Sequence, residues 1–322
     1  MDDITVLILG KVGDAQLKLL EDLDKSIRLE FAESSDDALA KAGDADVIFI
    51  WTASRDTLRM ALPRATKARW IHGRFAGLDH VASPELVGLT VPFTNGRGVF
   101  SQSLGEFVLG GMLYFAKDFA RMRRSQQAAR WDPFDVLEIR KQTMAIIGYG
   151  DIGKACAWRA KAMGMKVLAL RRRPELSSAD PHVDQVYHWD QRHQMIAAAD
   201  YVVVAAPLTE QTKGMVSDAE FNAMKPTGVI INVGRGPVID EPAMIRALET
   251  KRIKGAVLDV TSVEPLPSDS PLYRLENVLL SPHCADHTAD WLDDAMIFFK
   301  EQLQRFLNGQ PLENVVDLKR GY

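Results

Sequence analysis

The chain has 322 residues, enough for two domains that each bury a hydrophobic core. Hydrophobic residues make up 47% of it, charged residues 25%, and the formal net charge is −4. This composition is ordinary for a soluble globular protein and gives no reason to expect binding to nucleic acid or to an anionic membrane.

Cellular location is indicated by three features. The two cysteines, Cys156 and Cys284, form no disulfide framework. The N-terminal segment has acidic residues where a signal peptide has basic ones. No apolar run approaches the ~18 residues of a membrane span. We therefore expect a cytoplasmic protein.

Short apolar runs rich in β-branched residues alternate with helical patterns along the chain. Such runs are typical of parallel strands covered on both faces. The sequence therefore predicts an α/β protein with two Rossmann-like doubly wound parallel-sheet domains. The predicted strands are 4–9, 45–51, 68–73 and 89–95 in the first domain, and 143–150, 166–171, 201–207, 228–234, 255–260 and 277–283 in the second.

Two long helical patterns, at residues 101–124 and 287–309, flank the second group of strands. They fit a cofactor domain, residues 99–287, inserted into a substrate domain made of residues 1–98 and 288–322. A further helix is expected to open at Asp240–Pro242 and to end at Lys254 and Gly255. The last residues, 315–322, are predicted to be a tail.

A glycine-rich loop follows the predicted strand at 143–150 and opens a helix. Its G-x-G-x-x-G pattern falls on Gly148, Gly150 and Gly153, with Asp151 and Ile152 between them. In this context the pattern indicates a dinucleotide site, because the glycines let the backbone approach a pyrophosphate at the helix N-terminus.

The next predicted strand ends in a run of three arginines, Arg171, Arg172 and Arg173. NAD-binding proteins carry an acidic residue there, about 20 positions after the glycines, to bind the ribose 2′-hydroxyl. Here that residue is absent, and a guanidinium group suits a 2′-phosphate. We therefore expect NADP(H) to be favoured, with NAD(H) still possible; the alternative is a solvated basic turn.

Three sequence blocks, at residues 206–216, 232–248 and 255–285, resemble the signature blocks of the D-isomer-specific 2-hydroxyacid dehydrogenases. The resemblance covers most of residues 70–290. It implies an active site between two Rossmann-like domains, usually a homodimer, and a catalytic Arg, Glu and His, which fall on Arg235, Glu264 and His283.

The chemistry of reducing a 2-oxo acid gives each of these residues a task. Arg235 can hold the carboxylate and polarise the carbonyl as a permanent cation. His283 can donate a proton to the carbonyl oxygen as hydride arrives, and acts as the base in reverse. Glu264 would bind the other ring nitrogen and favour the imidazolium form. A structural histidine, a loop glutamate and a turn arginine are the alternatives.

Further residues are assigned through the same resemblance. Ala76 and Gly77 fall in a loop whose N–H groups would hold the substrate carboxylate. Cofactor contacts are expected from Pro207, Thr212, Val233 and Asp259. Trp51 is either a wall of the substrate pocket or a core residue. The sequence departs from the family at His80, after Asp79, and at Asp286, where glycine is usual. No Cys/His spacing indicates a metal site.

These expectations converge on an NADPH-preferring reductase that converts small 2-oxo acids, such as glyoxylate or hydroxypyruvate, to D-2-hydroxy acids. Two alternatives remain: phosphite dehydrogenase, which keeps the same three residues, and a non-catalytic dinucleotide-sensing protein on the same fold. A homodimer is expected, with residues 105–122 as the contact helix.

Overall fold

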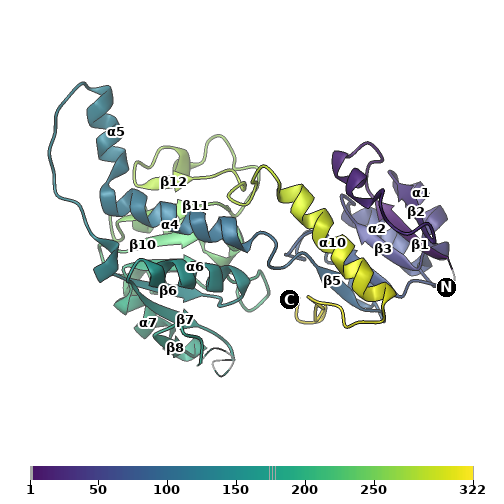
Figure 1. Ribbon diagram of the computed structural model, residues 1–322. Coiled ribbons are helices and arrows are strands. Elements are labelled where there is room, and N and C mark those ends of the chain that lie inside the picture. The colour runs from purple at the N-terminus through teal and green to yellow at the C-terminus, as the bar shows by residue number, and fades with distance from the viewer. Residues whose placement is uncertain (1–2, 174, 176, 178, 322) are drawn as a thin grey trace. The chain divides into compact units, whose positions relative to one another are not determined.

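The computed structural model describes residues 3–173, 175, 177 and 179–321. The chain folds into two compact units, one from Met1–Phe100 and Ala289–Tyr322, the other from Ser101–Thr288 (Figure 1). Each is built on a parallel sheet with helices on both faces, so the predicted fold class is confirmed.

The first unit contains a five-stranded sheet in the order β2-β1-β3-β4-β5. Its strands are β1 (Ile4–Leu9), β2 (Ile27–Ala32), β3 (Val47–Ile50), β4 (Trp70–Gly73) and β5 (Phe93–Asn95). Strand β2 was missed in the sequence; only two of its six residues, Ile27 and Ala32, are buried. Sequence analysis made β5 too long, because Pro92 cannot donate to a neighbouring strand.

Helices cover both faces of this sheet. One face packs against α1 (Ser35–Lys41), α2 (Arg55–Ala61) and α3 (Pro84–Val87). The other packs against α10 (Trp291–Leu307), which brings Phe299 onto the ring of Phe49 with their centroids 3.9 Å apart. The predicted C-terminal tail is wrong in part: Val316 donates its N–H to the carbonyl of Phe93, so this segment pairs with β5.

The second unit contains a seven-stranded parallel sheet in the order β12-β11-β10-β9-β6-β7-β8. The strands are β6 (Thr143–Ile147), β7 (Lys166–Leu170), β8 (Gln185–Tyr187), β9 (Tyr201–Val204), β10 (Val229–Asn232), β11 (Gly255–Leu258) and β12 (Val278–Leu280). Helices α4 (Ser101–Lys117) and α6 (Asp151–Ala162) cover one face.

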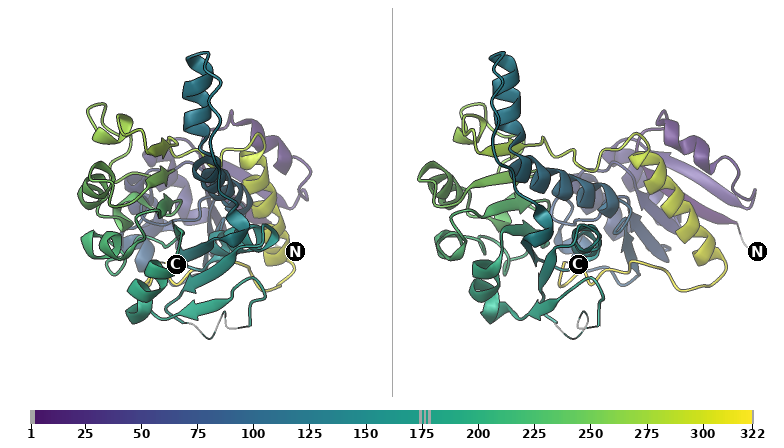
Figure 2. Two further views of the ribbon diagram at one scale, coloured as in Figure 1. Left: turned by 90° about the vertical axis from the view of Figure 1, so that its left-hand side faces the viewer. Right: turned by 60° about the vertical axis from the view of Figure 1, so that its left-hand side comes forward.

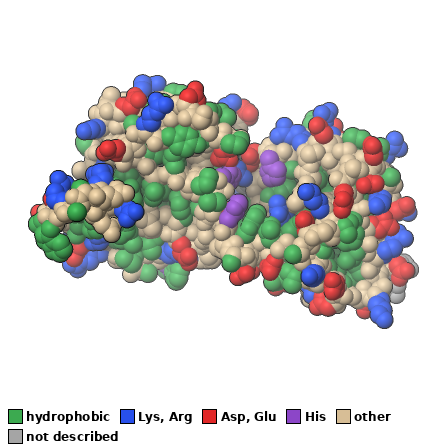
Figure 3. Space-filling model, turned by 90° about the horizontal axis from the view of Figure 1, so that it is seen from above, with side chains coloured by type: hydrophobic (Ala, Val, Ile, Leu, Met, Phe, Trp, Pro, Cys, Tyr) green, Lys and Arg blue, Asp and Glu red, His purple; other side chains and the backbone are tan. Residues whose placement is uncertain are grey.

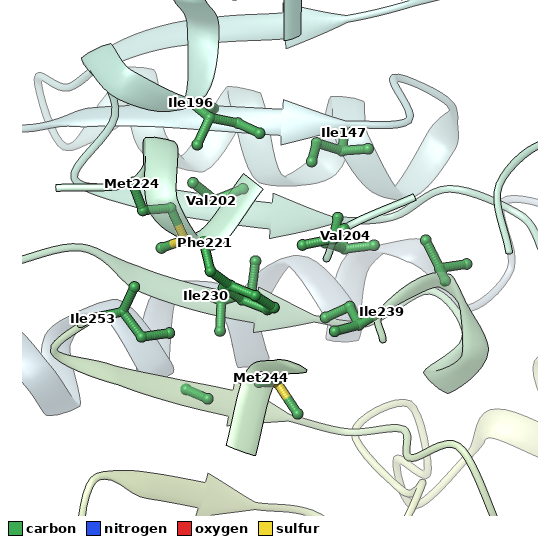
Figure 4. Close-up of a cluster of buried hydrophobic side chains, with 14 of the residues drawn as sticks. Ile147, Ile196, Val202, Val204, Phe221, Met224, Ile230, Ile239, Met244 and Ile253 are labelled. Atoms are coloured by element: carbon green, nitrogen blue, oxygen red, sulfur yellow. The ribbon is translucent and has the colours of Figure 1, made fainter. Parts of the chain in front are cut away.

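Helices α7 (Arg192–Ala198), α8 (Asp218–Ala223) and α9 (Glu241–Glu249) cover the opposite face. Figure 4 shows their apolar side chains meeting those of the strands: Phe221 and Met224 lie over Ile230. The predicted end of α9 is wrong. The helix stops at Glu249, Lys251 takes a left-handed conformation (φ 54°), and Gly255 is already the first residue of β11.

The long helix predicted at residues 101–124 is interrupted. Asp118 adopts a left-handed conformation (φ 50°), and its side chain accepts a hydrogen bond from the N–H of Arg121 to cap a new helix, α5 (Phe119–Gln127). Figures 1 and 2 show α5 projecting from the body of the second unit. The segment that follows returns to the body, where the N–H of Leu137 donates to the carbonyl of Ala116.

Two properties of the whole chain bear on its surroundings. Within the described residues, no helix combines the length and the apolar character needed to cross a membrane. On the face that Figure 3 presents, acidic and basic side chains are mixed over both units rather than gathered by sign.

Candidate functional site

The carboxyl edge of the seven-stranded sheet gathers the predicted cofactor and catalytic residues of the second unit. In a parallel sheet all strands end at this edge, and open α/β sheets bind ligands there. The glycine loop follows β6, the arginines follow β7, Arg235 follows β10, Glu264 follows β11 and His283 follows β12.

The glycine loop is shaped by close backbone approaches. Gly148 has φ +92°, and a Cβ there would lie 2.6 Å from the backbone of Ala206. A Cβ on Gly153 would lie 2.8 Å from the carbonyl oxygen of Gly148. At Gly150, by contrast, a Cβ would meet nothing within 4 Å. The loop is therefore tight against the sheet and open on the side of Gly150, which precedes α6.

The N-terminus of α6 is suited to a phosphate. Its N-cap residue is Gly150, which has no side chain to cap the helix, and Asp151 and Ile152 are its first two residues. The backbone N–H groups of a first helical turn lack partners inside the helix and favour anions. These features fit the pyrophosphate of a dinucleotide, which would lie over Gly150.

The three arginines lie in different environments. Arg171 donates its backbone N–H to the carbonyl of Tyr187 and its guanidinium to the hydroxyl of Ser177. Arg172 is exposed, and its Nη1 donates to Oε1 of Gln211 at 3.1 Å. Arg173 is exposed as well. Arg172 is thus connected to the loop after β9, where two other predicted cofactor residues lie.

Those residues are Pro207 and Thr212. The hydroxyl of Thr212 donates to the carbonyl of Pro207 at 2.6 Å, which closes the loop after β9. Val233, also predicted to contact the cofactor, directly follows β10 and is buried in the core. Pro207 is exposed and Thr212 is half-buried, so both are accessible to a ligand, whereas Val233 is buried and packs in the core at the sheet edge.

Arg235 lies in a turn between two glycines, and a side chain at either position would force the backbone to shift. A Cβ on Gly234 would lie 2.7 Å from the carbonyl oxygen of Ala206, and one on Gly236 only 1.9 Å from that of Thr261. Asn232, buried at the end of β10, accepts from the N–H of Gly234 and donates to the carbonyl of Arg235. Sequence analysis did not identify this role of Asn232, although an amide at a strand end before a turn is a signal for it.

Glu264 and His283 form a close pair. Oε2 of Glu264 lies 2.6 Å from Nδ1 of His283, and Oε1 accepts the N–H of Thr261 at 3.0 Å. The carboxylate is therefore held from two sides. Since Nδ1 of His283 is bound to Glu264, the other ring nitrogen, Nε2, is the one that can hydrogen-bond a ligand. The two residues are 19 positions apart, so only their places at neighbouring strand ends bring them together.

Asp259 organises the turn that carries His283. It is buried (3% exposed), and its Oδ1 accepts three hydrogen bonds, from the hydroxyl of Ser281 and from the N–H groups of Cys284 and Ala285. Its carbonyl accepts the N–H of His283, whose φ of +53° is left-handed. Sequence analysis expected Asp259 near the nicotinamide and did not anticipate this structural task.

The residue after this turn is a second carboxylate. Asp286 stands where glycine is usual, and burial raises its pKa above the ordinary value of 3.8, with the charge of Asp259 adding to the effect. His287 and His283 act in the opposite direction. Among the described residues there is no cluster of three or more His, Cys, Asp or Glu side chains that could hold a metal ion.

The predicted substrate loop lies in the first unit, after β4. The carbonyls of Phe75 and Ala76 accept hydrogen bonds from the N–H of Gly96 and the side chain of Asn95. The N–H groups of Phe75, Ala76 and Gly77 donate to no acceptor among the residues that the structure describes. Trp51 is buried (2% exposed) and belongs to the core of this unit.

Comparison with known proteins identifies the family of this chain. Residues 109–285, more than half of the chain, match the model of the D-isomer specific 2-hydroxyacid dehydrogenase, NAD binding domain. A glyoxylate/hydroxypyruvate reductase B of Yersinia pestis is 33% identical over 229 residues, which cover 68% of each chain.

A D-3-phosphoglycerate dehydrogenase of Methanocaldococcus jannaschii is 28% identical over 98% of this chain, which spans only 60% of that relative's length. A D-isomer specific 2-hydroxyacid dehydrogenase of Xanthobacter autotrophicus, solved with NADPH and MES, superposes with a TM-score of 0.86 at 28% identity, covering 98% of this chain and 99% of its own. The chain therefore belongs to the D-isomer specific 2-hydroxyacid dehydrogenase family.

Proposed function

We propose that this protein is an NADPH-preferring reductase of small 2-oxo acids, glyoxylate and hydroxypyruvate among them, and that it produces D-2-hydroxy acids. The observation that carries the proposal is the Glu264–His283 pair, 2.6 Å apart, at the same sheet edge as Arg235 and the glycine loop. A carboxylate-bound imidazole, a guanidinium and a dinucleotide loop are the groups that this reaction needs.

Each residue has one task in the proposed mechanism. The nicotinamide, when bound, supplies hydride to C2 of the oxo acid. Arg235 binds the carboxylate and draws electron density toward the carbonyl oxygen. Nε2 of His283 gives that oxygen a proton as negative charge develops on it, and Glu264 stabilises the imidazolium before transfer. The N–H groups of Ala76 and Gly77 bind the substrate carboxylate as further donors.

The cofactor preference rests on the end of β7. Arg171 and Arg172 lie where a carboxylate would bind the ribose of NAD, and Arg172 is joined to the loop of Pro207 and Thr212 through Gln211. A phosphate placed there would gain charge-assisted hydrogen bonds from both guanidinium groups. The ribose of NAD offers no charge to them, so NADH gains less.

Initial rates with glyoxylate and hydroxypyruvate, measured with NADPH and NADH at matched concentrations, test this function directly. Turnover that favours NADPH supports it. The double variant Arg171→Gln/Arg172→Gln should raise KM for NADPH at least about tenfold and leave NADH nearly unchanged. Lys166→Gln, which removes one positive charge at the other end of β7, is the control and should change neither value. Equal losses for both cofactors would show that the arginines support structure.

The variant His283→Ala tests whether the protein is a reductase that uses this histidine as its proton donor. His283→Ala should lower kcat at least about 100-fold while NADPH still binds, because the ring acts on charge that exists only in the transition state. Near-full activity of this variant would rule out the proton-donor role. Wild-type protein that binds NADPH but reduces no 2-oxo acid and oxidises no phosphite would favour the dinucleotide-sensing alternative.

We also propose a homodimer formed through α4 and the projecting α5 arm. The arm, residues 118–137, consists of α5 and the segment that returns to the body of the unit. It exposes large apolar side chains that a second copy could cover, among them Trp131 with 96% of its surface accessible. The others are Phe119, Met122, Val136 and Leu137. Sedimentation of the wild type should give twice the monomer mass, and Met122→Glu/Trp131→Glu should give the monomer. A wild-type monomer would exclude the dimer.

A further inference from the structure

An arginine of the first unit lies on two tryptophan rings. Arg74 directly follows β4 and Trp51 directly follows β3, and the last residues of these strands, Gly73 and Ile50, are paired in the sheet. The Arg74 Cζ atom lies 4.6 Å from the centroid of Trp51 and 5.4 Å from that of Trp291, at the start of α10. The guanidinium is therefore fixed at the carboxyl edge of the five-stranded sheet, where ligands of open α/β sheets bind.

The guanidinium of Arg74 makes no hydrogen bond or ion pair with any residue that the structure describes. None of its N–H donors reaches an acceptor among the described residues, and no carboxylate there lies within ion-pair distance. The charge of Asp14 raises the pKa of Arg74, but Oδ2 of Asp14 accepts the indole N–H of Trp51 at 2.7 Å. Burial lowers the pKa of Arg74, and Asp14 opposes this only in part.

The geometry of stacking directs these donors outward. A guanidinium that lies on an aromatic face keeps its N–H groups in its own plane, away from the ring. Two residues further along, the N–H groups of Ala76 and Gly77 also reach no acceptor in the described part of the chain, although the carbonyls of Phe75 and Ala76 accept hydrogen bonds from Gly96 and Asn95. One short segment thus presents two sets of open donors.

The number of negative charges on the substrate suggests what Arg74 binds. A 2-oxo acid with an uncharged side chain carries one negative charge, and within this unit the proposed function assigns that carboxylate to the N–H groups of Ala76 and Gly77. A second cation held partly out of water, without a protein anion, is costly unless a ligand supplies the partner. A planar guanidinium binds carboxylate or phosphate through two parallel hydrogen bonds.

We infer that Arg74, held on Trp51 and Trp291, binds a second anionic group of the substrate, so that the preferred substrates are 2-oxo acids whose side chain ends in a carboxylate or a phosphate. This inference rests on the proposed function and makes it narrower. Trp51, a core residue by its burial, then acts as a positioning residue, because its indole face fixes the plane of the guanidinium.

The test compares four 2-oxo acids with NADPH: glyoxylate and pyruvate, which lack a second anion, oxaloacetate, which has a carboxylate, and 3-phosphohydroxypyruvate, which has a phosphate. We expect wild-type kcat/KM to be at least tenfold higher for one of the last two, and the higher of them identifies the anion. In Arg74→Gln the ratio of anionic to uncharged substrate should fall 10- to 100-fold, mainly through KM. Arg74→Lys should recover part of it.

Arg69→Gln is the matched control, because Arg69 also stacks on an aromatic ring, with Cζ 4.9 Å from the centroid of Phe306, but it precedes β4 and has a carboxylate neighbour in Asp46. Its substrate ratio should equal that of the wild type. Equal losses for all four substrates in Arg74→Gln, or a wild type that reduces glyoxylate best, would overturn the inference and leave the proposed function standing.

A binding measurement keeps the inference testable even if no 2-oxo acid is reduced. Succinate and inorganic phosphate are titrated into the protein while tryptophan fluorescence is recorded, since two of the rings contact Arg74. Saturable quenching by one of them in the wild type, and its loss in Arg74→Gln but not in Arg69→Gln, would support the anion site without any activity. Identical titrations in all three proteins would refute it.

Discussion

Replacing Asp259 by alanine should uncouple His283 from the rest of the site. Three donors converge on Oδ1 of Asp259, and two of them are the N–H groups of Cys284 and Ala285. Each hydrogen bond to a charged acceptor contributes about 1.5–3 kcal/mol. The bonds also hold His283 in a left-handed conformation that costs about 1–2 kcal/mol for a residue other than glycine.

These values set the size of the expected effect. The three bonds are not additive, and water replaces some of them, so we expect the native turn to lose about 2–4 kcal/mol relative to other conformations. Since about 1.36 kcal/mol corresponds to a factor of ten, kcat/KM should fall about 30- to 1,000-fold. Ser281→Ala removes only one of the donors and should lower it no more than about tenfold.

The assay is kcat/KM for hydroxypyruvate with NADPH, together with NADPH affinity by fluorescence and the melting temperature. The reasoning predicts that NADPH affinity changes little, because the turn positions a proton donor. It would be refuted by an Asp259→Ala enzyme within threefold of the wild type. A loss of NADPH affinity as large as the loss of kcat/KM would show instead that Asp259 acts by contacting the cofactor.

Three further predictions concern stability and geometry. His72 is fully buried, and burial lowers its pKa from 6.5 to about 3, so below pH 6.5 the unfolded chain binds the proton more readily than the folded one. The contribution of His72 to the free energy of unfolding is complete above pH 6.5 and should fall by about 1.4 kcal/mol per pH unit as acid is added. Urea titrations should find a smaller slope in His72→Leu. Asp286 has a raised pKa, so its ionised form opposes folding. Asp286→Asn should melt higher than the wild type near neutral pH, and the difference should vanish as the pH falls below the ordinary pKa of 3.8. Gly236→Ala would place a Cβ 1.9 Å from the carbonyl oxygen of Thr261, so Arg235 should be displaced and kcat/KM should drop about 100-fold, whereas an active variant would mean that the turn can shift.

Much of the second unit could be predicted from the sequence because its strands are continuous apolar runs. Six of its seven strands were predicted, and only β8 was missed, a three-residue strand that begins with Gln185. The interruption at Asp118 could not be predicted, because no glycine or proline marks it. Its left-handed conformation is instead held by the cap on α5 and by the pairing of Leu137 with Ala116.

The candidate site, too, could be predicted from the sequence only in part. The resemblance named Glu264 and His283, and the structure places them 2.6 Å apart. What supports them could not be predicted, because the bonds of Asp259 to residues 281–285 depend on how two strand ends lie side by side. Arg74 gave no signal either: its environment comes from Trp51 and Trp291, which are 240 positions apart in the sequence and meet only after folding.

The return of the chain to the first unit has a consequence for its biosynthesis. Helix α10 supplies Ala295, Met296, Phe299 and Leu303 to one face of the five-stranded sheet, yet these residues leave the ribosome after the whole second unit. Until then this apolar face of β1 and β3 is covered only in part, by the segment that contains Leu20. The second unit, whose residues are continuous, can complete its own core first. In the cell the second unit should therefore fold before the first unit is complete. Until α10 emerges from the ribosome, the N-terminal hundred residues should remain accessible to chaperones.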